Sequence, residues 1–227
     1  MMQDSLIQCL WNSKDSLVCL VPYAFEPNWV YIFTIIMMLL SAVGLPLPEE
    51  ATLVSVGLLA YMGLHPGKYP PPFAGAPHVD AKTAALVAFL AVLFSDFIIY
   101  SIGRFFGRKI FDWKPIRSIL SEENRIKIEE WTQKYGTYAC GIFRFTPGIR
   151  FPGHLACGML KFPAWKFCLI DGIAALISVP TQILLLAFYG DYILKFLKQF
   201  KIGVLCLIVI IVIYLLYKKF FTKKAAV

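Results

Sequence analysis

The sequence predicts an all-α integral membrane protein, with about four transmembrane helices, two opposed re-entrant helical hairpins and an amphipathic interfacial helix. Hydrophobic residues make up 59% of the 227-residue chain and charged residues 16%, with a mean hydropathy of +0.68. Soluble domains carry roughly 45–50% apolar and about 25% charged residues. Several uncharged runs are long enough to cross a bilayer, and prolines and glycines interrupt two of the apolar segments.

The first half of the chain contains a span and a broken segment. Trp29–Leu45 is an uncharged run of 17 residues, just long enough for a transmembrane helix. Gly44-Leu-Pro-Leu-Pro-Glu-Glu50 then interrupts the apolar pattern, which continues to Leu64. We therefore expect a re-entrant hairpin near residues 44–64, followed by a polar connection over residues 65–80.

Two further spans each contain a single acid. Thr83–Ile102 includes Asp96, and Phe167–Gly190 includes Asp171. Between these spans, an apolar stripe in residues 121–135 predicts the interfacial helix, and a second re-entrant hairpin is expected near residues 136–159. A last uncharged run, 202–217, predicts a C-terminal transmembrane helix.

The strongest functional signal lies inside the second broken segment. Arg144 and Arg150 sit in an apolar run, with Pro147 and Gly148 between them. Guanidinium groups at membrane depth are costly, so they persist mainly where they line a cavity or bind an anion. Irregular backbone is tolerated there only when it is buried in protein or faces water. These four residues are therefore the predicted substrate-binding set.

The distribution of basic residues predicts the topology. With both termini cytoplasmic and both hairpins re-entrant, 15 lysines and arginines lie on the cytoplasmic side and 5 on the other, as the positive-inside rule requires. The hairpins then enter from opposite sides, as in the inverted repeats of transporters. We expect a multi-pass protein of the bacterial inner membrane, with an N-terminal segment (1–28), a membrane domain (29–190) and a C-terminal helix with a basic tail (191–227).

Three motifs occur in order along residues 29–190: Gly44-Leu-Pro-Leu-Pro-Glu-Glu50, Ser95-Asp-Phe-Ile-Ile-Tyr-Ser-Ile-Gly-Arg-Phe-Phe-Gly107 and Arg144-Phe-Thr-Pro-Gly-Ile-Arg150. They resemble, in turn, the elements Pro-x-Pro-Gly-Glu, Gly-Asp-x-x-x-Tyr-x-x-Gly-Arg-x-x-Gly and Arg-Phe-x-Pro-Gly-x-Arg of the DedA family, also called the VTT or SNARE-associated Golgi protein family. Glu49 and Ser95 stand in place of family glycines, and Ser41 stands where many members carry an acid.

The resemblance implies two re-entrant loops that face each other and a role in lipid handling or ion-coupled transport. Bacterial members are linked to recycling of the polyprenyl-phosphate carrier lipid, and eukaryotic relatives to phospholipid scrambling. Arg144 and Arg150 allow two interpretations here: they pair with internal acids and hold the fold together, or they clamp a phosphate headgroup. We favour the clamp, because guanidinium binds phosphate bidentately and a helix break exposes backbone N–H groups.

The acids have unequal expected roles. Glu50 is the candidate proton site, although a carboxylate there could equally stabilise the positive end of the following helix. Glu49 is expected to be its solvent-facing neighbour. Asp171 is expected to pair with Lys161 or Lys166.

Asp96, Tyr100 and Arg104 are spaced by four residues, which places them on one helix face. Asp96 would lie inside the membrane and is the second proton-coupling candidate. For Tyr100 and Arg104 we favour a supporting role that anchors a hairpin.

The cysteines and histidines predict no catalytic or metal site. The six cysteines form no CxxC pair and are expected to be apolar filler, with a Cys9–Cys19 disulfide left open. Pro152-Gly-His154 is similar to part of a membrane phosphatase motif, but no later histidine follows to act as the nucleophile. We expect no enzyme and no cofactor.

These observations predict a transporter or flippase for an anionic lipid headgroup, either a polyprenyl phosphate or a phospholipid, with a proton or cation as the coupling ion. The alternatives are an ion- or proton-coupled small-solute antiporter and a non-transporting membrane-homeostasis scaffold. The net charge of +8 indicates contacts with anionic lipid, not with nucleic acid, because the basic residues flank apolar segments. A homo-oligomer is compatible with the sequence.

Overall fold

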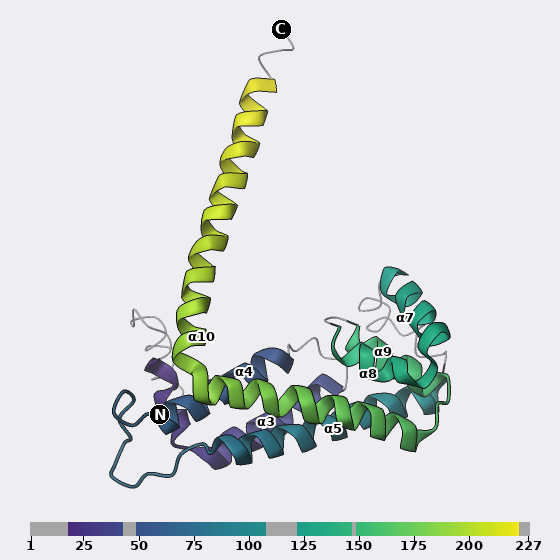
Figure 1. Ribbon diagram of the computed structural model, residues 1–227, viewed down its shortest axis with the longest axis horizontal. Helices are drawn as coiled ribbons and strands as arrows, with labels where there is room; N and C mark the ends of the chain where they lie inside the picture. Colours follow the sequence, from purple (N-terminus) through teal and green to yellow (C-terminus); the bar gives the residue numbers. More distant parts are fainter. Residues whose placement is uncertain (1–17, 43–48, 108–121, 147–148, 223–227) are drawn as a thin grey trace. The chain divides into compact units, whose positions relative to one another are not determined.

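The computed structural model describes residues 18–42, 49–107, 122–146 and 149–222, and every regular element in these ranges is helical (Figure 1). The chain divides into two units, one up to Phe188 and one from Tyr189 onward. The tip of the first expected hairpin, at Pro46 and Pro48, lies outside the described residues. In chain order the elements are η1 (Val18–Leu20), α2 (Val21–Ala24), α3 (Pro27–Ala42), α4 (Glu49–Leu64), α5 (Ala81–Phe106), α7 (Glu122–Tyr135), η3 (Gly136–Tyr138), α8 (Ala139–Arg144), α9 (Arg150–Met159) and α10 (Ala164–Thr222).

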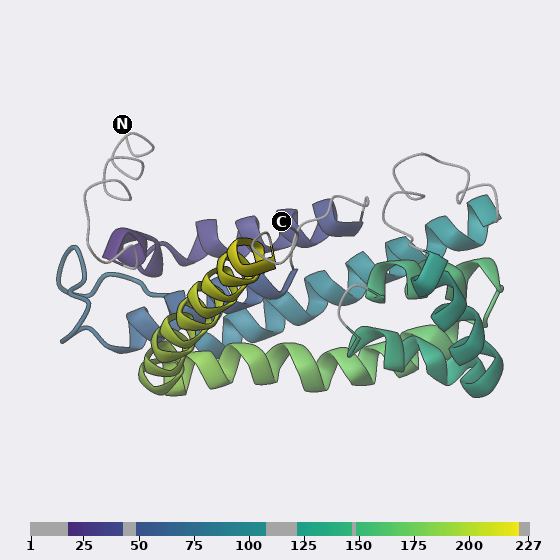
Figure 2. The same cartoon turned by 90° about the horizontal axis from the view of Figure 1, so that it is seen from above.

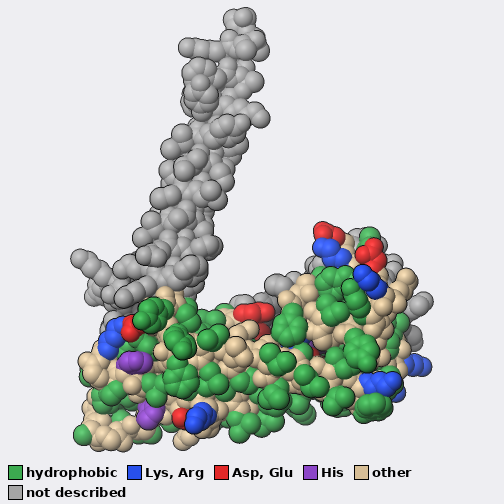
Figure 3. Space-filling view, viewed as in Figure 1, with side chains coloured by type: hydrophobic (Ala, Val, Ile, Leu, Met, Phe, Trp, Pro, Cys, Tyr) green, Lys and Arg blue, Asp and Glu red, His purple; other side chains and the backbone are tan. Residues whose placement is uncertain are grey.

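Two described helical segments are long and apolar enough to cross a membrane, judged by length and composition: Ala81–Phe106 and Ala164–Ile193. They contain the spans predicted at 83–102 and 167–190. Large apolar side chains on both segments are exposed, among them Leu86, Leu90 and Phe94 on α5. Figure 3 shows apolar side chains over much of the visible face, as expected of a surface that meets lipid. The described regular elements are therefore all helical, with two long apolar helices, which is consistent with the predicted all-α membrane class.

The first unit is built from long helices that run parallel or antiparallel to one another. α3 and α5 run in one direction, while α4 and the first part of α10 run in the opposite direction (Figure 2). The Ser95 hydroxyl of α5 donates to the Met38 carbonyl of α3 at 2.9 Å. Gly57 of α4 lies so close to α10 that a Cβ there would come within 2.7 Å of Leu186.

Asp80 caps the N-terminus of α5. Its carboxylate accepts hydrogen bonds from the backbone N–H and the hydroxyl of Thr83, both at 2.8 Å. The backbone N–H of Thr83, which bonds the ionised form, is the largest cause that holds the pKa of Asp80 below its usual value.

Replacing Asp80 by alanine should therefore lower the free energy of unfolding by about 1 kcal/mol at neutral pH. Because the folded-state pKa lies below that of the unfolded chain, the stabilisation is present at neutral pH and disappears as the pH falls through the folded-state pKa. Thermal unfolding in detergent at neutral and acidic pH measures both effects. Asp80→Asn is the control, since asparagine also caps helices; equal losses in the two variants would contradict a capping role.

α8 and α9 form a broken pair of short helices. α8 ends at Arg144 and α9 begins at Arg150, while Pro147 and Gly148 lie outside the described residues. A disulfide joins Cys140 of α8 to Cys157 of α9. The chain has positive φ on either side of the pair, 55° at Gly136 and at Lys161.

The expectation that the cysteines are filler is wrong for this pair, and also for Cys19, which is disulfide-bonded. Cys9 lies outside the described residues. The bond between Cys140 and Cys157 forms because the backbone returns after the break, which brings residues 17 positions apart to a Cα–Cα distance of 6.5 Å.

The apolar stripe of α7 packs against this pair of helices. Ile128 is buried, and the ring of Trp131 stacks on that of Phe143 with 5.9 Å between centroids. Tyr135, which shares the predicted stripe, is exposed. The stripe therefore contributes to the core around α8 and α9.

α9 lies with its backbone directly against that of α5. A Cβ on Gly158 would collide with the Tyr100 carbonyl oxygen, and one on Gly103 would collide with the Leu155 carbonyl oxygen. Glycine at these positions lets the two helices approach this closely. Residues 96, 100 and 104 of α5 are spaced by four, as are residues 150, 154 and 158 of α9. This crossing positions the polar side chains described next.

Candidate functional site

Charged side chains from five helices meet in the interior of the first unit. Arg144 donates from Nη1 to Asp96 Oδ2 at 2.6 Å and to Asp171 Oδ1 at 2.8 Å. Arg150 donates from Nη2 to Asp96 Oδ1 at 2.7 Å. With two further residues described below, they form what we name the ion cluster: Glu49, Asp96, Arg144, Arg150, His154 and Asp171.

Arg144 is held by hydrogen bonds from two of its nitrogens, Nη1 and Nε. Besides its two carboxylate partners, its Nε donates to the Ser178 hydroxyl at 3.2 Å. Asp171 and Ser178 are seven residues apart on α10 and therefore share one helix face. Only 3% of the Arg144 side chain is exposed, so this guanidinium is held as a structural centre of the cluster.

Arg150 is less completely enclosed. It forms ion pairs with Asp96 and with Glu49 of α4, and 15% of its side chain is exposed. Its Nε is buried and has no hydrogen-bond partner among the residues that the structure describes. A buried N–H without a partner costs free energy, so Arg150 retains a donor that a ligand could use.

The structure reverses the expected exposure of the two neighbouring glutamates. Glu49 is buried and paired with Arg150, whereas Glu50 is exposed. Consecutive residues of a helix point in different directions, so only one of the two can face the arginine. The interpretation of Glu49 as the solvent-facing acid is therefore wrong.

Asp171 also has partners other than those expected. Instead of Lys161 or Lys166, both of which are exposed, it pairs with Arg144 and lies 3.4 Å from His154 Nε2. The lysines precede it by ten and five residues, spacings that do not bring them onto its helix face.

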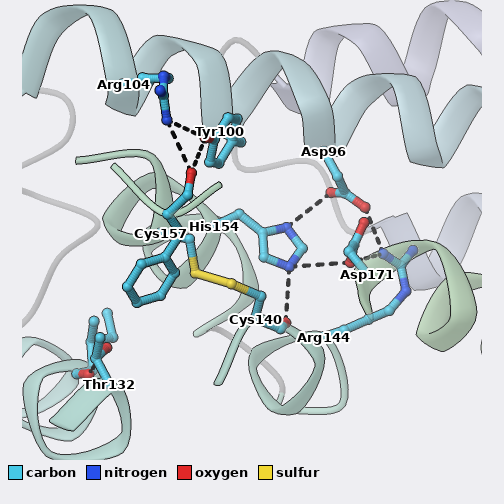
Figure 4. Close-up of a disulfide and its surroundings, with 11 residues drawn as sticks. Asp96, Tyr100, Arg104, Thr132, Cys140, Arg144, His154, Cys157 and Asp171 are labelled. Atoms are coloured by element: carbon cyan, nitrogen blue, oxygen red, sulfur yellow. Dashed lines mark hydrogen bonds and ion pairs between the residues drawn. A yellow bond between two sulfur atoms is a disulfide. The ribbon is translucent and has the colours of Figure 1, made fainter. Parts of the chain in front are cut away.

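Tyr100 and Arg104 hold the segment that follows α9 (Figure 4). The Tyr100 hydroxyl donates to the Phe162 carbonyl at 2.5 Å, and Arg104 Nη1 donates to the same carbonyl at 3.0 Å. Arg104 also donates to the Tyr100 hydroxyl at 2.7 Å. Both side chains thus connect α5 to the end of the broken pair of helices, and neither contacts Arg144 or Arg150 in the bonds described here.

His154 is the member of the ion cluster that the sequence interpretation missed. Its ring is completely buried on α9, with Nδ1 3.2 Å from Asp96 Oδ1 (Figure 4). One signal in the sequence does point to it: His154 follows Arg150 by four residues, which places both side chains on one face of α9.

The cluster resembles a metal site in its donor atoms but not in its charges. Asp96, His154 and Asp171 offer ligand atoms within 4.8 Å of one another. However, Arg144 donates to both carboxylates. A guanidinium cation thus already occupies the position between them that a metal ion would take.

Buried charges of this number require pairing, because an uncompensated charge in an apolar interior is strongly destabilising. Charges placed between helices whose outer faces are apolar are typical of functional sites in membrane proteins. Fold and site together define the class of the protein: an α-helical membrane protein with an internal polar site.

The comparisons with known proteins identify the family. The chain belongs to the VTT domain family, whose model matches residues 47–192. It is 33% identical over 162 residues to an uncharacterized membrane protein of Haemophilus influenzae, and the aligned residues cover 71% of each chain. It is 29% identical over 130 residues to the uncharacterized membrane protein YbfM of Bacillus subtilis, covering 57% of this chain and 70% of that one. No solved structure matches it.

Proposed function

We propose that this protein is a membrane carrier that moves an anionic lipid headgroup, of a polyprenyl phosphate or a phospholipid, between leaflets with coupling to protons. The observation that carries the proposal is Arg150, a partly exposed guanidinium inside an apolar fold with one N–H free of partners. Guanidinium groups bind phosphate through paired, charge-assisted hydrogen bonds. Phosphate and carboxylate compete for the same donors.

Competition gives the carrier its mechanism. Asp96 accepts from Arg144 and Arg150 and lies 3.2 Å from His154 Nδ1, whereas Glu49 contacts the cluster through Arg150. Of the two carboxylates on Arg150, Glu49 is therefore the one that a phosphate would displace. A displaced carboxylate can take up a proton, so Glu49 replaces Glu50 beside Asp96 as the proposed proton-coupling acid.

The proposed architecture follows the transporter plan. Four spans and two opposed re-entrant hairpins, near 44–64 and 136–159, would place the site between discontinuous helices near the midplane. The short helices α8 and α9, which end and begin at the two arginines, support this arrangement. We further propose cytoplasmic termini and the bacterial inner membrane as location, with residues 29–190 as the transporting domain.

A second candidate is an ion- or proton-coupled small-solute antiporter. Its support is the charge of the ion cluster, in which three carboxylates face two guanidinium groups. An excess of buried carboxylate favours a proton or cation as ligand.

Reconstitution of the full chain in liposomes tests the proposal. We expect the protein to accelerate the transbilayer movement of polyprenyl phosphate, which an impermeant phosphatase detects, or of fluorescent phosphatidylglycerol. Fluorescent phosphatidylcholine should move between leaflets more slowly than these anionic lipids. Arg150→Lys keeps the charge but loses the planar paired donors, so it should fold and lose transport. Proton flux without lipid movement would favour the antiporter, and no flux of any kind would favour a scaffold.

The two adjacent glutamates provide a matched pair of variants. Glu49→Gln should reduce lipid transport at least tenfold, since the loss of one hydrogen-bonded charge pair of about 1.5–3 kcal/mol corresponds to that factor. Glu50→Gln removes the same charge from an exposed position one residue away and should transport like the unaltered chain. Equal rates for the two variants, measured in the same liposomes, would rule out a role for the Glu49–Arg150 contact.

A further inference from the structure

Within the described part of the chain, the polar atoms that pair with the His154 ring nitrogens are all hydrogen-bond acceptors. Nδ1 lies 3.2 Å from Asp96 Oδ1, while Nε2 lies 3.4 Å from Asp171 Oδ1 and 3.3 Å from the Cys140 carbonyl oxygen. Figure 4 shows the ring between the two carboxylates. On its other side the ring meets Phe167 edge-on, with 5.4 Å between centroids.

A neutral imidazole does not fit these neighbours. It has one N–H and one nitrogen with a lone pair, so it donates on one side only. Whichever tautomer formed, the lone pair of the other nitrogen would point at a carboxylate or a carbonyl oxygen. A buried acceptor facing another acceptor is costly. Only the imidazolium form donates on both sides.

The charges of the ion cluster lead to the same form. Glu49, Asp96 and Asp171 carry three negative charges when ionised, and Arg144 and Arg150 carry two positive ones. With a neutral imidazole the cluster has a net charge of −1, and with an imidazolium it is neutral. A buried cluster is stable when its charges are balanced.

The groups around the ring come from every neighbouring element. α5 contributes Asp96, α10 contributes Asp171, and α8 contributes Arg144, which donates to both of these carboxylates. α9 itself contributes Arg150, and α4 contributes Glu49 behind it. Asp96 and Asp171, which lie beside the imidazole, thus each also accept a hydrogen bond from an arginine. The positive charge of the imidazolium then balances the negative charge of the third carboxylate, Glu49.

We propose that His154 carries a second exchangeable proton of this site, besides the one that a displaced Glu49 takes up, and holds it as an imidazolium beside Asp96 and Asp171. The imidazolium joins α9 to α5 and to α10, because its two N–H groups donate to carboxylates on those helices. Release of its proton leaves a lone pair against a carboxylate oxygen and a net negative charge, which weakens the hold on α9 beside Arg150. This deepens the proposed function, and only its link to transport rests on that function.

Nitrogen NMR of the full chain in lipid bilayers, with ¹⁵N-labelled histidine, tests the proposal directly. The chain contains three histidines, His65, His78 and His154, and the double variant His65→Gln/His78→Gln leaves one label. We expect the signals of both ring nitrogens of His154 to be those of protonated nitrogens at neutral pH, as the imidazolium form requires. One protonated and one unprotonated nitrogen at neutral pH would overturn the proposal.

Two single variants protect the assignment if the double variant does not fold. The signals present in both His65→Gln and His78→Gln belong to His154, and the same expectation applies to them. His78 is exposed and His65 stacks on Tyr61, away from the ion cluster, so neither change touches the site.

A transport measurement then separates this inference from the function on which its last step rests. In liposomes that contain polyprenyl phosphate, the rate of the unaltered chain should depend on pH, and His154→Gln, which cannot bind a proton at this position, should depend on pH less steeply. A doubly protonated ring without lipid transport would support the proton site and reject the carrier. A neutral ring in a transporting protein would reject the proton site and retain the carrier.

Discussion

Asp96→Ala should lower the free energy of unfolding by about 3–5 kcal/mol, the usual cost of removing one partner of a buried ion pair. Asp96 accepts hydrogen bonds from Arg144, Arg150 and His154 and is completely buried. Its removal leaves the cationic groups with too few acceptors. Asp96→Asn should be destabilised as well, because the amide keeps the volume but not the charge.

Thermal unfolding in detergent measures this loss. Glu50→Ala is the matched control, since it also removes one helical carboxylate but from an exposed position, where substitutions usually change stability by less than about 0.5 kcal/mol. If Asp96→Ala unfolded at the same temperature as Glu50→Ala, the ion cluster would have no part in holding the helices together.

Gly158→Ala should prevent α9 from docking on α5, with a loss of about 3 kcal/mol or more. The added methyl group would collide with the Tyr100 carbonyl oxygen and come within 2.8 Å of the Arg104 backbone nitrogen. Both are backbone atoms, so no side-chain rotation can relieve the contact. Displacement of α9 would also pull Arg150 and His154 away from α5.

Gly172→Ala supplies the control for a helical glycine. A Cβ there meets only Leu93 Cδ1, at 3.7 Å, an ordinary contact, and alanine is favoured over glycine within helices by roughly 1 kcal/mol. This variant should be as stable as the unaltered chain or more so. Gly158→Ala with unchanged thermal stability and transport would show that α5 and α9 do not approach as closely as described.

Features encoded by local pattern were predictable from the sequence. The apolar run of α5 and the helix break between Arg144 and Arg150 depend on hydrophobic length and on proline and glycine, both of which act over a few residues. Pairing of the arginines with internal acids was one of the two interpretations open from the sequence, and not the favoured one; the structure shows it at Asp96.

Features set by packing between distant segments were not predictable in this way. Whether Glu49 or Glu50 faces Arg150 depends on the rotation of α4 about its axis, which is decided by tertiary contacts. The Cys140–Cys157 bond depends on how the chain returns after the break. The role of His154 required the positions of carboxylates 58 and 17 residues away.

The disulfide between α8 and α9 restricts how the site can be reached. Because Cys140 and Cys157 join the two arms, Arg144 and Arg150 cannot be parted by spreading them. The backbone is left-handed at Gly136 and Lys161, where the chain enters and leaves the pair. In the proposed carrier, entry of a headgroup would then require α8 and α9 to tilt together as one covalently joined body.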